Sequence, residues 1–353
     1  MIPVAVLTGF LGSGKTTLLG RLLKSPEFAR TAVIINEFGD VGLDHDLIET
    51  SEESFVELQT GCLCCAVRGD LVLTLEDMLR RRDEGRVAPF ERIVIETSGL
   101  ADPAPILHAL MSDAGLSQRL ELAGVVATVD VVNGLATLGK HPESVKQVAV
   151  ADRLILTKTD LPQAEPAGLS AQLAILNPSA TQIRASFGEI DPARLFDMGL
   201  RASPRSGRDV PAWLGLDVHG HVHGSGHAPG HPHERDSRGG HDAQISCFAI
   251  LREQPLHAIT LTLLLEVLAE HCGGDLLRLK GIVNVAESPD RPAVIHGVQH
   301  VFHPPAWLDR WPSDDRRTRL VCIVRDIPRG WIEALIAALE AEVEEVASNI
   351  MPA

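Results

Sequence analysis

The residues with the clearest chemical purpose lie at the start of the chain. A short apolar run, residues 2–7, leads into the pattern Gly9-x-x-x-x-Gly14-Lys15-Thr16. Glycines let the backbone N–H groups of such a turn converge on phosphate oxygens, and the following helix points its positive end at the same anion. The lysine supplies a cation to the β- and γ-phosphates, and the threonine hydroxyl is placed to ligate Mg²⁺. The pattern predicts a nucleoside-triphosphate site formed by Gly9, Gly12, Ser13, Gly14, Lys15, Thr16 and Thr17.

A second group follows another apolar run, residues 93–95. Glu96 ends that run, and Thr97, Ser98 and Gly99 come directly after it. The Glu96 carboxylate is placed to orient an attacking water or to hold Mg²⁺ through a water, and the Gly99 N–H to contact the γ-phosphate. We therefore expect Lys15, Glu96 and Gly99 to be catalytic. The alternative is an ordinary junction between a strand and a loop.

The segment Thr157-Lys158-Thr159-Asp160 predicts which base is bound. The Asp160 carboxylate can accept hydrogen bonds from the ring N–H and the amino group of guanine, while the stem of Lys158 covers the base. Such bonds contribute roughly 1.5–3 kcal/mol, which is enough for a strong preference for GTP. GTPases usually carry Asn where Thr157 stands, but the threonine hydroxyl can still tie this loop to the phosphate loop. Ser186 is a candidate for a further contact with the base; a surface turn without base contact is the alternative.

Three of the six cysteines, Cys62, Cys64 and Cys65, fall in one short segment. Thiolates are soft ligands suited to Zn²⁺, and Co²⁺ would fit the same tetrahedron. In an extended segment Cys65 faces away from the other two, so the three converge only if the chain turns. Glu37 and His108 are candidates for a fourth ligand. A redox-active thiol pair and plain buried cysteines are the alternatives.

The spacing of apolar residues predicts the elements that position these groups. Up to residue 213, apolar runs alternate with amphipathic stretches, which indicates an α/β domain with a mostly parallel sheet flanked by helices. Strands are expected at 4–8, 32–36, 93–96, 124–129 and 153–157, and helices at 16–23, 70–82 and 105–111.

The rest of the chain differs in composition. Residues 214–242 hold seven of the fifteen histidines in a Gly- and Pro-rich run, which predicts a linker that either buffers metal or is passive. Residues 243–347 predict a smaller α+β domain with an antiparallel sheet. Its strands are expected at 244–251, 276–285, 293–302 and 319–325, and its helices at 255–272 and 329–347. We thus expect three regions, with boundaries at 213 and 242.

Composition argues against several classes of function. A net charge of −15 disfavours nucleic acid as a partner, and an aromatic content of 4% leaves little for base stacking. No apolar stretch reaches the ~18 residues that a membrane span needs. The chain lacks a basic segment ahead of its first apolar run, so no signal peptide is expected and the predicted location is the cytoplasm.

Together the motifs resemble those of the CobW-type P-loop GTPases, which are related to the GTPases that mature urease and hydrogenase. The resemblance rests on five segments in the same order, and the stretches 277–282 and 296–303 look like that family's C-terminal domain. The five segments are Gly9-Phe-Leu-Gly-Ser-Gly-Lys-Thr-Thr17, Asn36-Glu-Phe-Gly39, Gly61-Cys-Leu-Cys-Cys65, Glu96-Thr-Ser-Gly99 and Thr157-Lys-Thr-Asp160.

The resemblance implies GTP hydrolysis coupled to the handling of zinc or cobalt, with delivery to a client metalloprotein or a metal-insertion enzyme. It also implies that residues 36–40 form a switch in which Glu37 and Gly39 respond to the nucleotide, and that the cysteines hold the metal. The identity of the metal and client, and whether the chain forms a homodimer, stay open. A nucleotide-gated metal store without turnover and a phosphoryl-transfer enzyme acting on a small metabolite are the competing interpretations.

Overall fold

The computed structural model describes residues 1–37, 55–59, 66–161, 168–187, 189–191 and 245–350, with the side chains of 36–37, 55–59, 66–70 and 347–350 left out. The chain divides into two compact units. The first contains Met1–Leu173 and the second most of the described residues after 245. Each unit is considered by itself.

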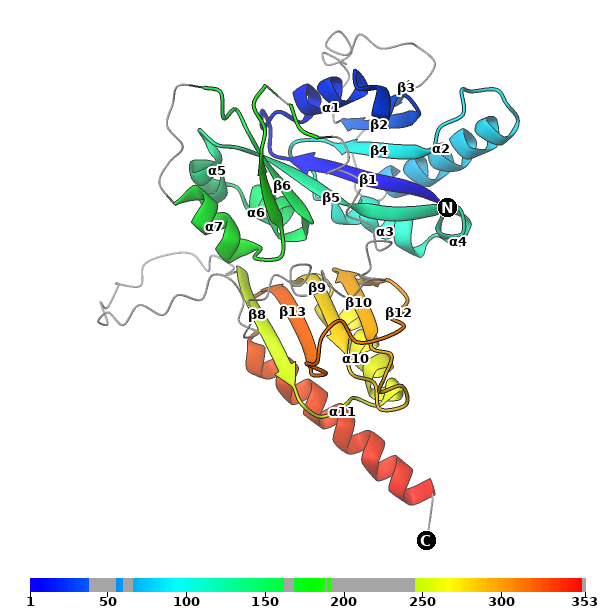
Figure 1. The fold of residues 1–353 in the computed structure, drawn as a ribbon, viewed down its shortest axis with the longest axis vertical. Coiled ribbons are helices and arrows are strands. Elements are labelled where there is room, and N and C mark those ends of the chain that lie inside the picture. The colour runs from blue at the N-terminus through cyan, green and yellow to red at the C-terminus, as the bar shows by residue number, and fades with distance from the viewer. Residues whose placement is uncertain (38–54, 60–65, 162–167, 188, 192–244, 351–353) are drawn as a thin grey trace. The chain divides into compact units, whose positions relative to one another are not determined.

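A seven-stranded parallel sheet forms the centre of the first unit, as expected from the alternating pattern (Figure 1). Its register is what positions the chemistry. Leu7 lies opposite Glu96 on one side of the central strand, and Gly9 lies opposite Thr128 on the other. The carboxyl ends of three adjacent strands therefore meet at one edge. In order across the sheet the strands are β3 (Phe55–Gln59), β2 (Thr31–Glu37), β4 (Arg92–Thr97), β1 (Ile2–Gly9), β5 (Leu120–Asp130), β6 (Arg153–Thr157) and β7 (Thr181–Arg184).

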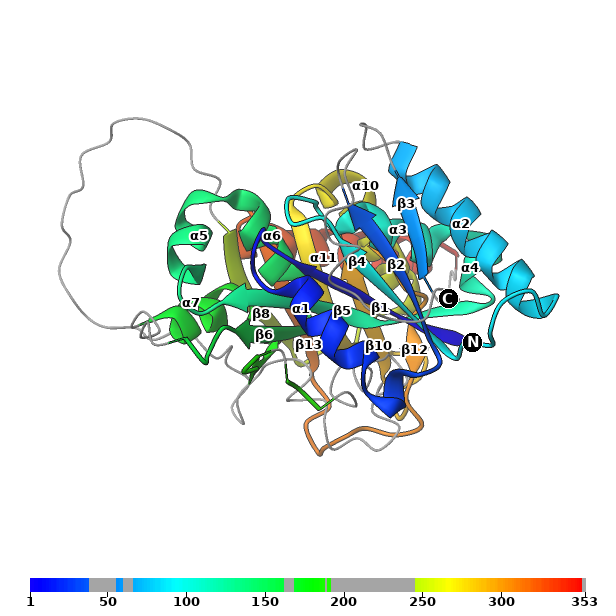
Figure 2. The same ribbon diagram turned by 90° about the horizontal axis from the view of Figure 1, so that it is seen from above.

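Helices cover both faces of this sheet. The crossover from β1 to β2 runs in the opposite direction across the sheet from the crossovers after β3, so right-handed connections place α1 on one face and the helices from α2 onward on the other. Figures 1 and 2 show α1 on the face opposite α3 and α6. The helices are α1 (Lys15–Leu23), η1 (Pro26–Phe28), α2 (Ala66–Asp83), α3 (Ala104–Ser112), α4 (Ala114–Ser117), α5 (Gly134–Lys140), α6 (Pro142–Val150) and α7 (Leu169–Leu176).

The expected strands and helices of this unit are all present, because their apolar runs fill the core. Leu18, Leu19 and Leu22 of α1 pack in one buried cluster with sheet residues such as Leu7 and Ile155. Burying a leucine side chain contributes about 1.5–3 kcal/mol, so this interface stabilises the start of α1 directly after the glycine-rich turn. The short strands β3 and β7 and the helices α5 to α7 did not stand out in the sequence. In β7 only Ile183 is buried, which leaves almost no periodic signal.

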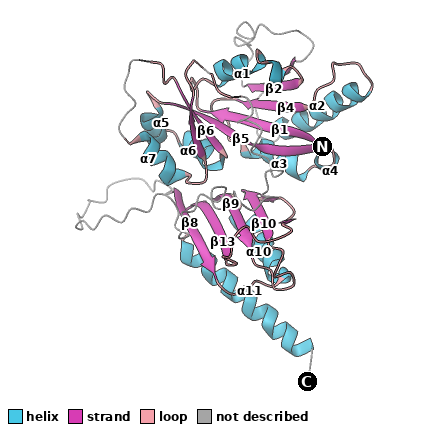
Figure 3. Cartoon of the chain, in the orientation of Figure 1, coloured by secondary structure: helices cyan, strands magenta, loops and turns pink. Residues whose placement is uncertain are grey.

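The second unit contains the antiparallel sheet that was expected for an α+β domain (Figure 3). Its strands are β8 (Ile245–Arg252), β9 (Leu276–Val283), β10 (Ala293–Val298), β11 (Val301–Phe302), β12 (Ala306–Trp307) and β13 (Thr318–Arg325), and its helices are α10 (Ala258–Cys272) and α11 (Arg329–Ile350). The strand expected over 293–302 is split in two, since Gln299 adopts a positive φ of 52° and turns the chain. Among the described helices, none has the length and apolar character to cross a membrane.

Candidate functional site

The glycine-rich turn connects the end of β1 to the start of α1. Gly14 is the N-cap of α1 with a φ of 92°, a left-handed conformation that residues with a side chain rarely adopt. Lys15 is only 7% exposed, and its Nζ donates to the carbonyl oxygens of Gly9 at 3.0 Å and Phe10 at 3.5 Å. The ammonium group is therefore held inside the curve of the turn, where a phosphate loop needs its cation.

Thr16 and Glu96 meet in space although they lie far apart in the sequence. The Thr16 hydroxyl donates to Glu96 Oε1 at 3.0 Å, and the Glu96 residue is 2% exposed. The next residue of β4 is tied to β1 as well, because the Thr97 hydroxyl donates to Thr8 Oγ1 at 2.9 Å. A threonine hydroxyl and a carboxylate side by side are the oxygen ligands that Mg²⁺ prefers, so the donor set fits that ion.

Gly99 lies directly against the phosphate loop. A Cβ added to this glycine would be 2.7 Å from the backbone nitrogen of Leu11 and 2.8 Å from its Cα. Only glycine permits such a close approach between two backbones. The structure thus brings together the three residues expected to be catalytic, Lys15, Glu96 and Gly99, around one turn.

The loop after β6 is tied to the same turn. The Thr157 hydroxyl donates to the carbonyl oxygen of Ser13 at 2.6 Å, so threonine makes the contact for which asparagine is usual. Asp160 Oδ1 accepts from the backbone N–H of Phe187 at 3.0 Å, and the hydroxyls of Thr159 and Ser186 are 2.8 Å apart. The residues expected to bind guanine therefore lie on two adjoining loops.

Asp130, which ends β5, is a functional candidate that sequence reasoning missed. Its Oδ2 pairs with Lys158 Nζ at 2.8 Å and accepts from Asn133 Nδ2 at 2.8 Å. Burial by itself would raise the pKa of Asp130, but the hydrogen bonds from Lys158, Asn133 and the Val132 N–H outweigh it and the pKa is lowered. The rule that ligands bind at the carboxyl ends of parallel strands would have pointed to this residue.

A cavity of about 310 Å³ opens beside the phosphate loop. Its wall combines Phe10, Leu11, Gly12 and Ser13 of that turn with the end of β5 and with residues of α5 and α6. Polar groups that line it include Ser13, Asp130, Gln147 and Lys158. We call it the phosphate-loop cavity.

Several residues expected to hold metal or to switch cannot be placed. Cys62, Cys64, Cys65 and Gly39 lie outside the described residues, as does the side chain of Glu37, the last residue of β2. His108 is half-buried on α3. Within the part of the chain that the structure describes, no group of three or more His, Cys, Asp or Glu side chains could hold a metal ion.

The three other cysteines lie on β8, α10 and β13. Cys272 and Cys322 are buried in the second unit, and Cys247 is partly buried. Burial raises the pKa of the Cys247 thiol to about 12. A thiol so far from ionisation is a poor metal ligand or nucleophile.

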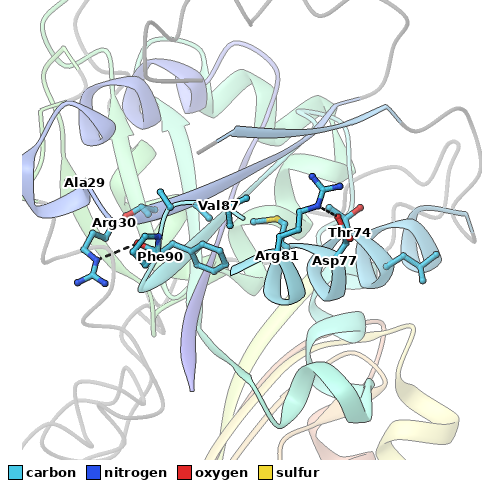
Figure 4. A pocket seen from close by; sticks show the side chains of 13 residues that line it. Ala29, Arg30, Thr74, Asp77, Arg81, Val87 and Phe90 are labelled. Carbon is cyan, nitrogen blue, oxygen red and sulfur yellow. Dashed lines mark hydrogen bonds and ion pairs between the residues drawn. The ribbon is translucent and has the colours of Figure 1, made fainter. Parts of the chain in front are cut away.

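A second cavity, of about 300 Å³, lies between α2 and the amino ends of β2 and β4 (Figure 4). Apolar side chains such as Leu73, Met78 and Phe90 line it. Its charged side chains already have partners: Arg81 Nε pairs with Asp77 Oδ2 at 2.6 Å, and Arg30 pairs with Glu91. We call it the α2 cavity.

Two family models match the chain. The nucleotide-binding domain of CobW/HypB/UreG matches residues 3–184, and the cobalamin synthesis protein cobW C-terminal domain matches residues 245–340. The zinc chaperone YjiA of Escherichia coli is 32% identical over 339 residues, which cover 96% of this chain and 98% of that protein. The zinc chaperone CobW of Pseudomonas aeruginosa is 31% identical over 366 residues, covering 94% of this chain and 89% of that protein.

Similarity extends to a solved structure. The crystal structure of Zn(II)-bound YjiA GTPase from Escherichia coli superposes with a TM-score of 0.67 at 27% sequence identity. The match covers 96% of this chain and 98% of that one. This chain is therefore similar to YjiA in both sequence and fold along nearly its whole length.

Proposed function

Because this chain belongs to the CobW/HypB/UreG family and carries a CobW C-terminal domain, we propose that it is a GTP-hydrolysing metallochaperone. It binds a transition metal, zinc or cobalt, through Cys62, Cys64 and Cys65, and delivers the ion to a client metalloprotein in the cytoplasm. The observation that carries the proposal is the convergence of Lys15, Glu96 and Thr157 on one phosphate loop. The names of the relatives, a zinc chaperone and a GTPase, support the metal and the reaction.

The phosphate loop accounts for binding of the triphosphate. The Lys15 ammonium lies against the carbonyl oxygens of the turn, and α1 begins directly after Gly14, so a cation and a helix N-terminus face the same anion. Thr16 and Glu96 would hold Mg²⁺, which when bound neutralises charge on the phosphates. Asp160 selects guanine, because its carboxylate accepts from both N–H groups on that edge of the base.

The loop from Glu96 to Gly99 accounts for hydrolysis. The Glu96 carboxylate orients the attacking water, and the Gly99 N–H contacts the γ-phosphate. Since Gly99 already lies against Leu11, loss of the γ-phosphate removes a contact at the junction of two loops. We propose that this change is transmitted to the switch at residues 36–40 and to the cysteines, and that it loosens the metal site.

Steady-state GTP turnover by the full-length protein, with and without Zn²⁺, tests the proposal. We expect slow intrinsic hydrolysis of GTP with little hydrolysis of ATP, because Asp160 rejects adenine. The Lys15→Ala variant should bind and hydrolyse GTP poorly. Wild-type protein that binds GTP and zinc yet shows no turnover above the Lys15→Ala variant would instead indicate a nucleotide-gated metal store.

A further inference from the structure

Helix α6 holds the loop that follows β4 through two side chains. Gln147 is 1% exposed, and its Nε2 donates to the carbonyl oxygens of Gly99 at 3.2 Å and Ala101 at 3.1 Å. One residue earlier, Lys146 Nζ lies 3.0 Å from Asp102 Oδ2. Both N–H groups of one buried amide are thus used on the loop whose first residue, Gly99, is expected to contact the γ-phosphate.

The same helix also touches the phosphate loop. At its N-terminus, the ring of His141 lies against that of Phe10, with 4.5 Å between the ring centroids. Gly99 in turn lies against the backbone of Leu11, so the loop after β4 is held between the phosphate loop and Gln147. The phosphate loop and Gln147 therefore hold the Gly99 peptide from two sides. Helix α6 contacts both the loop after β4 and the phosphate loop.

The Gln147 amide has an unusual distribution of hydrogen bonds. Among the described residues, its Oε1 is buried without a hydrogen-bond partner, and Gln147 lines the phosphate-loop cavity. A buried acceptor that stays unsatisfied is unfavourable for stability. The unsatisfied Oε1 lowers stability, so stability alone does not explain a glutamine at this position. Its two donated hydrogen bonds to the loop do explain it.

We propose that Gln147 is a positioning residue for GTP hydrolysis: it fixes the loop 99–101 so that the Gly99 N–H meets the γ-phosphate. The inference rests on the proposed GTPase function. Lys146, through its pair with Asp102, holds the next part of the same loop from a more exposed position. Gln147 acts only on the part of the site that senses the γ-phosphate, so GDP binding does not depend on it.

Gln147→Met tests the inference, because methionine keeps the length of the side chain and removes both donors. We expect kcat for GTP to fall by about tenfold, in line with the sensitivity of catalysis to small misplacements. The affinity for a non-hydrolysable GTP analogue should fall as well, while the Kd for GDP stays within about twofold of wild type. Gln182→Met is the matched control, since the Gln182 amide also donates to a carbonyl oxygen, that of Ser170, at 3.0 Å.

Two results would overturn the role of Gln147: an unchanged kcat in Gln147→Met, or an equal loss of affinity for GDP and for the analogue. If Gln147→Met does not fold, Lys146→Met carries the test, and its analogue-to-GDP affinity ratio must fall by at least about twofold. An unchanged ratio there also contradicts the inference. Failure of the proposed function itself is separate, since it would appear in the wild type as an absence of turnover and of guanine-nucleotide binding.

Discussion

The two cavities described in the first unit are nearly equal in volume, about 310 Å³ for the phosphate-loop cavity and about 300 Å³ for the α2 cavity, yet they lie at opposite ends of the strands. The first lies at the carboxyl end of β5 beside the phosphate loop, and Asp130 and Lys158 are among the residues that line it. The second lies at the amino ends of β2 and β4, against α2 (Figure 4). Size alone therefore does not identify a site of chemistry in this fold.

The difference follows from the direction of the strands. In a parallel sheet, the loops and helix N-termini that can bind anions gather at the carboxyl ends, while the amino ends receive helix C-termini. The basic residues Arg80, Arg81 and Arg82 end α2 and pair with carboxylates such as Asp77. Charged side chains of the α2 cavity such as Asp77 and Arg81 thus pair with each other, whereas Lys15 and Glu96 at the phosphate loop are placed for a ligand.

The largest expected effect comes from replacing one carboxylate in each region by its amide. Glu96→Gln should lower GTP turnover by about 100-fold or more, because it removes the charge that orients water or holds the ion. Asp77→Asn makes the same chemical change in the α2 cavity and should leave kcat within about twofold of wild type. Steady-state kinetics of both variants test the comparison. Equal losses would show that the carboxylate beside the phosphate loop is no more important for turnover than the one in the α2 cavity.

The next effect concerns the choice of base. Asp160→Asn removes an acceptor for the two N–H groups of guanine, so the Kd for GTP should rise by roughly 10- to 100-fold, as expected for hydrogen bonds to a charged group. Xanthosine triphosphate, whose edge carries a carbonyl oxygen in place of the amino group, should gain affinity. Calorimetric titration with both nucleotides measures this. A Kd for GTP that does not change would remove Asp160 from the guanine site.

A smaller effect is expected from widening the contact between two loops. In Gly99→Ala the new methyl group would lie 2.7 Å from the Leu11 nitrogen, so the loops must separate and turnover should fall about tenfold. Gly139→Ala is the control, since a Cβ there meets nothing within 4 Å. Comparable turnover in the two variants would show that the close approach of Gly99 to the phosphate loop has no catalytic role.

The smallest effect on turnover is expected from a substitution in the α2 cavity. Met78 is 6% exposed, and Met78→Ala should lower the free energy of unfolding by about 2–5 kcal/mol through lost packing. GTP turnover measured well below the melting temperature should stay unchanged. Denaturant unfolding and kinetics on the same preparation separate the two outcomes, and a large fall in kcat without a loss of stability would make the α2 cavity part of the active site.

Local sequence was sufficient for the features that depend on a single segment. The phosphate loop and the strands around it could be predicted because their glycines and continuous apolar runs are unambiguous within a few residues. The split at Gln299 could not, since a non-glycine residue with a positive φ leaves no signal in the pattern. The short strand β7 likewise has too few buried residues to show a period.

Features that depend on packing between distant segments could not be predicted from the sequence. Gln147 lies on α6, a helix that did not stand out in the sequence, and only the packing of α6 against the loop after β4 reveals its two hydrogen bonds. Asp130 follows a strand that the sequence predicts, but only the register, with Thr128 opposite Gly9, shows that this strand end adjoins the phosphate loop. Both residues require long-range contacts that no single segment encodes.

The central claim of the proposed function is that the phosphate loop and Cys62, Cys64 and Cys65 are thermodynamically coupled. Titration of Zn²⁺ into the full-length protein, first with GDP bound and then with a non-hydrolysable GTP analogue, tests it most directly. We predict tighter zinc binding in the analogue-bound state and, by reciprocity, tighter binding of the analogue when zinc is present. Equal zinc affinities in the two nucleotide states would contradict the account.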